Sequence, residues 1–258
     1  MCASRFLLVS LNIEAILEEV TIGQRKKHEE MARGNGLGDA HTATLARVKG
    51  QKKIESAFGL KVLKWVLYSE RPLRADGLCH ALAVKTGSLD LDPKIISVLR
   101  TLLSSFLGLV AVEASSSIVR LVHFTLQEHL LSSPTLFHSP HSKIAEVCLT
   151  YLNFGRIQES PASSLPSPPT MPLLEYPSFY WGKHAGMGMT GNIKILALRL
   201  LDRFDEHISA RLLLLRCNKN RGSGPYFRLE RGDTVFTVLH AVSFLGIVAI
   251  VATVLERK

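Results

Sequence analysis

The glycine-rich stretches are the first places to look for chemistry, because backbone amides beside glycine can cradle phosphate groups. Residues 186–191 read Gly-Met-Gly-Met-Thr-Gly, which matches the spacing of the dinucleotide-binding fingerprint. That fingerprint needs a β-strand before it, whereas residues 180–185 are typical of a helix. Residues 34–38 carry three glycines and also follow no strand. The first stretch is therefore predicted to be a turn between helices, and the second a helix end followed by a linker.

The sequence lacks the motifs of the common hydrolases. A P-loop needs GxxxxGK[ST], because its lysine and hydroxyl hold phosphate and magnesium. The only Gly-Lys pair is Gly182-Lys183, and His184 follows it. No GxSxG nucleophile elbow supports Ser/His/Asp catalysis. We therefore predict that the chain is not an enzyme and uses no cofactor.

Histidine and cysteine are the common soft metal ligands, and the chain has ten histidines and four cysteines. His138 and His141 are close in sequence, but no cysteine or carboxylate joins them at ligand spacing. We predict a loop there and no metal site. The cysteines form no CxxC pair, and Cys79 and Cys148 lie among apolar residues of predicted helices. This usage favours core thiols in a reduced, intracellular protein.

A single β-hairpin is predicted in the middle of an otherwise helical chain. Two short Val-rich runs, Leu109–Val112 and Ile118–Val122, alternate in polarity and flank the polar tip Glu113–Ser117. This pattern is typical of two antiparallel strands joined by a turn.

The second strand is predicted to run directly into a helix. Thr125 and Glu128 have the spacing of a capping box, in which the hydroxyl accepts a free helix N–H and the carboxylate reaches back to the cap. His123 lies at the junction between strand and helix.

Three helical segments precede the hairpin, at Glu55–Ser69, Ala75–Val84 and Asp92–Phe106. Three helices followed by a wing hairpin predict a winged helix. In DNA-binding members the third helix enters the major groove. Here that helix is mostly apolar, with only Lys94 and Arg100 as cations. We therefore predict that it is mostly buried and does not read DNA.

This arrangement resembles the winged-helix regulatory region of STAND-class, NLR-like proteins, above all the fungal kind that join a NACHT NTPase to ankyrin repeats. The resemblance is carried by the segments Trp65–Leu82, Val119–Leu130, Ser142–Phe154 and Tyr180–Ala185. It implies a non-catalytic regulatory and scaffolding role in signalling, with other proteins as partners.

The resemblance also implies a role for His123. In plant and animal relatives a Met-His-Asp motif ends this winged helix, and its histidine contacts the β-phosphate of bound ADP. Val122-His123-Phe124 is similar, although Phe124 replaces the aspartate. His123 would then sense nucleotide once an NTPase core is supplied. The residues leave a second interpretation open, in which His123 simply packs between hairpin and helix.

The resemblance implies a mainly α chain in four parts. Residues 1–53 would be the helical end of a NACHT-like module and residues 54–133 the winged helix. A helical spacer would follow at 134–224, with a Pro/Ser-rich loop at 160–172, and an ankyrin-like repeat at 225–258.

The ankyrin assignment depends on the motif residues Thr237, Leu239, His240 and Gly246. It predicts two short antiparallel helices with Gly246 at the turn. A rival interpretation is a C-terminal membrane anchor over Val238–Leu255, which requires one continuous helix because a span satisfies its backbone internally.

The net charge of +9 raises the question of a nucleic-acid or membrane partner. The cations are spread over residues 25–27, 47–53 and 216–231, and no stretch interleaves them with stacking aromatics. Solvated faces are the favoured interpretation, and a winged-helix nucleic-acid binder is the alternative. We predict protein partners, with no specific nucleic acid, no membrane and no small-molecule substrate.

The N-terminus is not predicted to be a signal peptide. Its apolar run is interrupted by Asn12 and Glu14, and no small-residue cleavage site follows. A cytoplasmic location is therefore expected.

Overall fold

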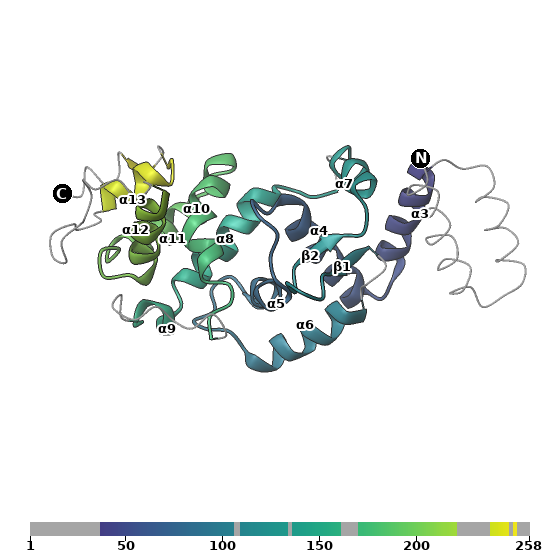
Figure 1. The fold of residues 1–258 in the computed structure, drawn as a ribbon, viewed down its shortest axis with the longest axis horizontal. Helices are drawn as coiled ribbons and strands as arrows, with labels where there is room; N and C mark the ends of the chain where they lie inside the picture. Colours follow the sequence, from purple (N-terminus) through teal and green to yellow (C-terminus); the bar gives the residue numbers. More distant parts are fainter. Residues whose placement is uncertain are drawn as a thin grey trace, which may run out of the picture. The chain divides into compact units, whose positions relative to one another are not determined.

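The computed structural model describes residues 37–105, 109–133, 136–160, 170–220, 238–247 and 250–251. This part of the chain is mainly helical, with one small antiparallel hairpin, as predicted (Figure 1). The chain divides into two compact units. The first comprises residues 1–75 and 101–138, and the second comprises residues 76–100 and 139–258.

The first unit contains helices and the hairpin. Its elements are α3 (Leu37–Gly50), α4 (Lys53–Tyr68), β1 (Val110–Val112), β2 (Val119–Leu121) and α7 (Phe124–Leu131). α4 is amphipathic, and its apolar face supplies much of the core of this unit through Phe58, Val62, Leu63 and Trp65, all buried.

The hairpin has the predicted partners, with Val110 opposite Leu121 and Val112 opposite Val119. The residues that follow α4 form main-chain hydrogen bonds to the hairpin on the side of β2 that faces away from β1. There the amide of Val119 donates to the Leu73 carbonyl at 2.9 Å, and the amide of Ala75 donates to the Ser117 carbonyl at 2.8 Å. The wing is thus tied to the end of α4 by main-chain hydrogen bonds.

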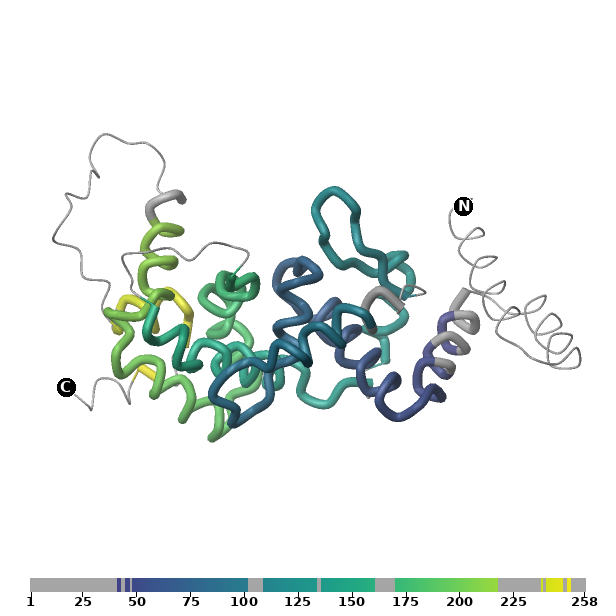
Figure 2. Tube along the Cα trace, turned by 90° about the horizontal axis from the view of Figure 1, so that it is seen from below, coloured from purple at the N-terminus to yellow at the C-terminus, as the bar shows by residue number. Residues whose placement is uncertain are grey.

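The second unit is built around α8 (Pro140–Leu152). α8 packs against α10 (Glu175–Met187) and α11 (Gly191–Leu201), and α10 packs against α12 (Ile208–Asn220). Figures 1 and 2 show these helices gathered in one cluster with the short helices α9 (Gly155–Gln158) and α13 (Val238–Phe244). Its core is aromatic. The largest fully buried side chains are Trp181, Tyr151, Tyr176, Phe154 and Phe204.

The remaining helices of the predicted winged helix are α5 (Ala75–Ala83) and α6 (Pro93–Ser105). α6 begins as predicted, because the Asp92 carboxylate accepts the amide of Lys94 at 2.9 Å and Pro93 occupies the first helical position. The predicted burial of α6 is wrong for its described side chains. Residues 93–101 are all half-buried or exposed, and Val98 is 58% exposed.

The two described core cysteines agree with the sequence. Cys79 and Cys148 are buried free thiols. Burial raises the pKa of the Cys79 thiol to about 11 and raises that of Cys148 still further. Both thiols therefore stay protonated and chemically inert near neutral pH.

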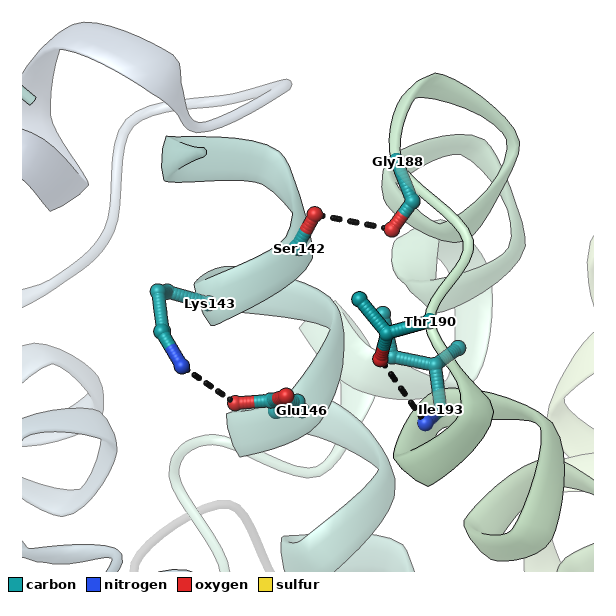
Figure 3. A network of polar contacts seen from close by, with 6 residues as sticks. All are labelled: Ser142, Lys143, Glu146, Gly188, Thr190 and Ile193. Atoms are coloured by element: carbon teal, nitrogen blue, oxygen red, sulfur yellow. Dashed lines mark hydrogen bonds and ion pairs between the residues drawn. The ribbon is translucent and has the colours of Figure 1, made fainter. Parts of the chain in front are cut away.

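The glycine-rich stretch at 186–191 is the predicted turn between helices (Figure 3). The Ser142 hydroxyl of α8 donates to the Gly188 carbonyl at 2.8 Å, and a Cβ on Gly188 would overlap that hydroxyl. Thr190 then caps α11, because its hydroxyl accepts the Ile193 amide at 3.2 Å. Gly188 thus allows a close approach of backbone to α8, whereas an added Cβ at Gly186 or Gly191 would meet no atom within 4 Å.

Candidate functional site

His123, the predicted nucleotide-sensing residue, is the N-cap of α7. Its backbone is extended, with φ −152° and ψ 147°, and its Nδ1 accepts the amide hydrogen of Thr125 at 3.2 Å. The predicted capping box is therefore wrong. β2 ends at Leu121 and the helix starts at Phe124, so Thr125 already has helical geometry and cannot be the cap.

The Thr125 hydroxyl joins two histidines from different elements. Its oxygen lies 2.8 Å from Nδ1 of His123 and 3.0 Å from Nε2 of His41, which belongs to α3. His41 is 84 residues from Thr125 in sequence. No local pattern predicts this contact, so sequence reasoning missed His41.

A third histidine completes the group. His129, one turn further along α7, lies 3.3 Å from the Thr42 hydroxyl through its Nε2, and its ring centroid is 5.7 Å from that of His41. We call His41, Thr42, His123, Thr125 and His129 the histidine cluster. It lies within the first unit and joins α3 to α7.

The electrostatics of the histidine cluster disfavour positive charge. Burial lowers the pKa of His41 below its ordinary value of 6.5, and the imidazoles of His129 and His123 lower it further. Over the described ranges, no three His, Cys, Asp or Glu side chains are arranged to hold a metal ion. His41 is therefore neutral near neutral pH, and it belongs to a hydrogen-bonded group of imidazoles and hydroxyls.

The cap sets the tautomer of His123. Nδ1 accepts the Thr125 amide, so the ring hydrogen is assigned to Nε2. His123 is half-buried, and no described residue bonds its Nε2. The neighbouring Phe124 is 63% exposed. The arrangement presents an imidazole N–H that can donate to an oxygen acceptor such as phosphate.

A second polar network lies in the core of the second unit. The Tyr176 hydroxyl is 2.8 Å from Nε2 of His184, and Nδ1 of His184 is 2.8 Å from Nδ1 of His141. Tyr176 and His184 are buried, and the two imidazoles stack with centroids 5.1 Å apart. The predicted loop at His141 is wrong, because Pro140 starts α8 and places His141 in its first turn. The only sign of this network in the sequence was the spacing of Tyr176 and His184, because residues about two turns apart share one face of a helix.

The predicted ankyrin residues lie in or beside α13. Thr237 falls outside the described residues, and Leu239 is within the helix. His240 is exposed on it. Gly246 has φ +69° and ends the helix, as predicted.

The end of α13 is a Schellman motif. The amide of Ile247 donates to the Val242 carbonyl at 3.0 Å, and the amide of Gly246 donates to the Ser243 carbonyl at 3.2 Å. Helical geometry resumes at Ile250. The continuous helix that a membrane anchor requires is therefore broken at Gly246. In the ranges that the structure describes, no helix is long and apolar enough to cross a membrane.

α13 docks on α10 at a glycine. A Cβ built on Gly182 would lie 2.6 Å from Leu245 Cβ and 2.8 Å from the Leu245 carbonyl oxygen. Ala241, Val242, Leu245 and Ile247 are buried. The short helix thus buries its apolar face within the second unit.

Comparison with known proteins identifies one region. Residues 44–145 match the family model described as "GPI inositol-deacylase, winged helix domain", which covers less than half of the chain. No curated protein and no solved structure matches the chain. A winged helix is therefore present, as predicted. The match does not extend to the residues after 145 and says nothing specific to NACHT or ankyrin architecture.

Proposed function

We propose that the chain is a non-catalytic regulatory and scaffolding segment of an NLR-like signalling protein, and that its winged helix binds other proteins. A winged helix can contact either protein or nucleic acid, so the surface of its third helix decides between them. That helix, α6, carries the observation on which this proposal depends.

α6 has only two side chains of the kinds that read base edges, Lys94 and Arg100, and its other described residues are apolar or small and hydroxyl-bearing. Ile95 and Ile96 are half-buried, and Val98 is 58% exposed. Of its two cations, Arg100 is paired with the Asp76 carboxylate at 2.7 Å. Base edges are read by Arg, Lys, Asn or Gln. The exposed composition of α6 therefore favours a protein partner over nucleic acid.

The test compares two exposed apolar residues. Val98→Asp adds a charge to α6, whereas Leu89→Asp adds one at a residue that is 77% exposed and precedes α6. After cross-linking in cells, partners that bind through α6 are lost from Val98→Asp and kept by Leu89→Asp. Equal capture by both variants would count against α6 as the binding surface.

Nucleic acid is tested separately by fluorescence anisotropy with duplex DNA. The charge of +9 predicts weak binding that disappears as salt rises. Sequence-selective binding at physiological salt would overturn the proposal and favour the nucleic-acid alternative.

The proposal includes a nucleotide-sensing role for His123 when an NTPase core is supplied. Its support is the tautomer that the α7 cap imposes, which leaves Nε2–H as a donor. The chain alone is expected to bind no ADP. In a longer gene product that carries a NACHT core, His123→Ala is expected to weaken ADP retention, whereas His138→Ala is not. Equal ADP retention by the two variants would remove His123 from the proposal.

The proposal gives α13 the role of the first ankyrin-like helix, with residues 1–53 as the end of a NACHT-like module. The turn at Gly246 supports the first part. The sequence that flanks the chain in its gene is the direct test. A Walker A motif upstream and further repeats downstream are expected, and the absence of both would contradict this architecture.

We propose no catalytic activity for the chain. The family description names a deacylase, and that activity belongs to the named protein, whose winged helix is the part matched here. Purified protein is expected to hydrolyse neither nucleotides nor esters. Turnover that persists through repeated purification would refute this part of the proposal.

A further inference from the structure

A chain of side-chain hydrogen bonds holds α3 against the start of α7. It runs from Nε2 of His41 through the Thr125 hydroxyl to Nδ1 of His123, with separations of 3.0 and 2.8 Å. A second link joins Thr42 to His129 at 3.3 Å. Both links cross from α3 to α7, so they are side-chain contacts between elements rather than part of either helix.

Counting hydrogens shows that this chain of bonds depends on a neutral His41. Nδ1 of His123 accepts the Thr125 amide and hydroxyl, and the same hydroxyl oxygen accepts Nε2–H of His41. A hydrogen on Nδ1 of His123 could be accepted by the Thr125 hydroxyl after rotation, so the loss there would be limited to the Thr125 amide. Protonating His41 would place one on its Nδ1, which is buried and has no partner among the described residues.

Among the side chains that the structure describes, no charge offsets protonation of His41. The described ionisable groups that act on it are His129 and His123, and both lower its pKa. Glu128 of α7 is exposed to solvent and does not contribute. α4 is the other helix packed on α3, and it carries Lys53, Glu55 and Lys61 at its start and middle. These side chains are also exposed to solvent and do not contribute to the pKa shift of His41.

We propose that the histidine cluster is a pH-sensitive latch, which holds α3 on α7 while the buried His41 is neutral and releases α3 when His41 takes up a proton. This inference is independent of the proposed signalling role, because it concerns only contacts within the first unit.

The direction of the pH effect follows from proton linkage. The docked state lowers the pKa of His41 below 6.5, so the released state binds the proton more readily. Docking is therefore fully stabilised above about pH 6.5 and weakens as the pH falls below it. The released state binds one more proton, on His41, than the docked state. The ratio of docked to released molecules therefore falls about tenfold for each pH unit below about 6.5.

The test is hydrogen exchange of the full chain between about pH 7.5 and about pH 5.5, after correction for intrinsic exchange. Protection of the α3 amides is expected to fall about tenfold. Amides of α4, which belongs to the first unit and contains no histidine, serve as the internal reference and are expected to lose less protection than those of α3.

Variants separate the latch from general acid sensitivity. His41→Gln keeps a side-chain N–H that can donate to the Thr125 hydroxyl, and it cannot be charged. This variant should lose most of the pH dependence in α3, so that its protection changes by less than about threefold between the two pH values. His138→Gln, which removes an exposed histidine outside the cluster, should behave as the wild type does.

Three results would overturn the latch. The first is unchanged α3 protection between the two pH values in the wild type. The second is full pH dependence in His41→Gln. The third is an equal loss of protection in α4, because that would mean unfolding of the first unit rather than release of α3.

Discussion

Replacing Gly182 by alanine is the sharpest test of how α13 docks on α10. The new Cβ would lie 2.6 Å from Leu245 Cβ, 2.8 Å from the Leu245 carbonyl oxygen and 3.0 Å from Ile247 Cδ1. Carbon atoms in contact are normally about 3.5–4.0 Å apart. Two of the three obstructing atoms belong to the backbone or to a Cβ, so no rotamer change relieves the overlap and α13 must move by about 1 Å.

The magnitude follows from two opposing effects. Overpacking of this kind costs about 1–3 kcal/mol, whereas alanine gains up to about 1 kcal/mol over glycine inside a helix. Gly186, in the last turn of the same helix, has no atom within 4 Å of an added Cβ. Gly186→Ala therefore has the propensity gain without the overlap. The two variants should differ by about 1–3 kcal/mol, with Gly182→Ala the less stable.

Thermal unfolding and hydrogen exchange measure this difference at two levels. A gap of 1–3 kcal/mol corresponds to roughly 2–12 °C in Tm for a chain of this size. If α13 undocks alone, its amides should lose protection in Gly182→Ala while those of α8 do not. Equal Tm and equal α13 protection in the two variants would refute the close packing of α13 on α10.

Three further outcomes are expected. Tyr176→Phe removes the hydroxyl that bonds the buried His184 at 2.8 Å, and should lower the free energy of unfolding by about 1–3 kcal/mol in denaturant titration. Thr190→Ala removes the hydroxyl that caps α11 at the Ile193 amide, and should lower it by about 1 kcal/mol in the same assay, whereas Thr190→Ser should be near neutral. Burial lowers the pKa of His207 below 6.5, so the unfolded chain takes up the proton first, and Tm should be highest above about pH 6.5 and decline as the pH falls below it; a Tm that rises on acidification would contradict this.

Features that depend on neighbouring residues were predictable. The hairpin followed from alternating apolar residues on either side of a polar tip, and its strands pair as that pattern requires. Asp92 with Pro93 marked the start of α6, and Gly246 marked the end of α13. Each is decided by backbone groups within a few residues, so the relevant information lies close together in the sequence.

The junction at His123 shows where local reasoning reaches its limit. Two candidate caps, His123 and Thr125, lie two residues apart, and both side chains can accept a helix amide. The choice depends on where β2 stops pairing with β1, because that sets which residue keeps an extended backbone. Pairing with β1 is a contact between strands, so the capping motif alone gave the wrong residue.

Only the tertiary structure decided the contacts that could matter for function. His41 and Thr125 are 84 residues apart, and His141 and His184 are 43 apart, yet each pair is within hydrogen-bond distance. The apolar pattern of α6 predicted a buried helix, and yet Val98 is 58% exposed. Periodicity tells which side chains share a helix face. Whether another element covers that face depends on packing between segments far apart in the chain, which no local pattern contains.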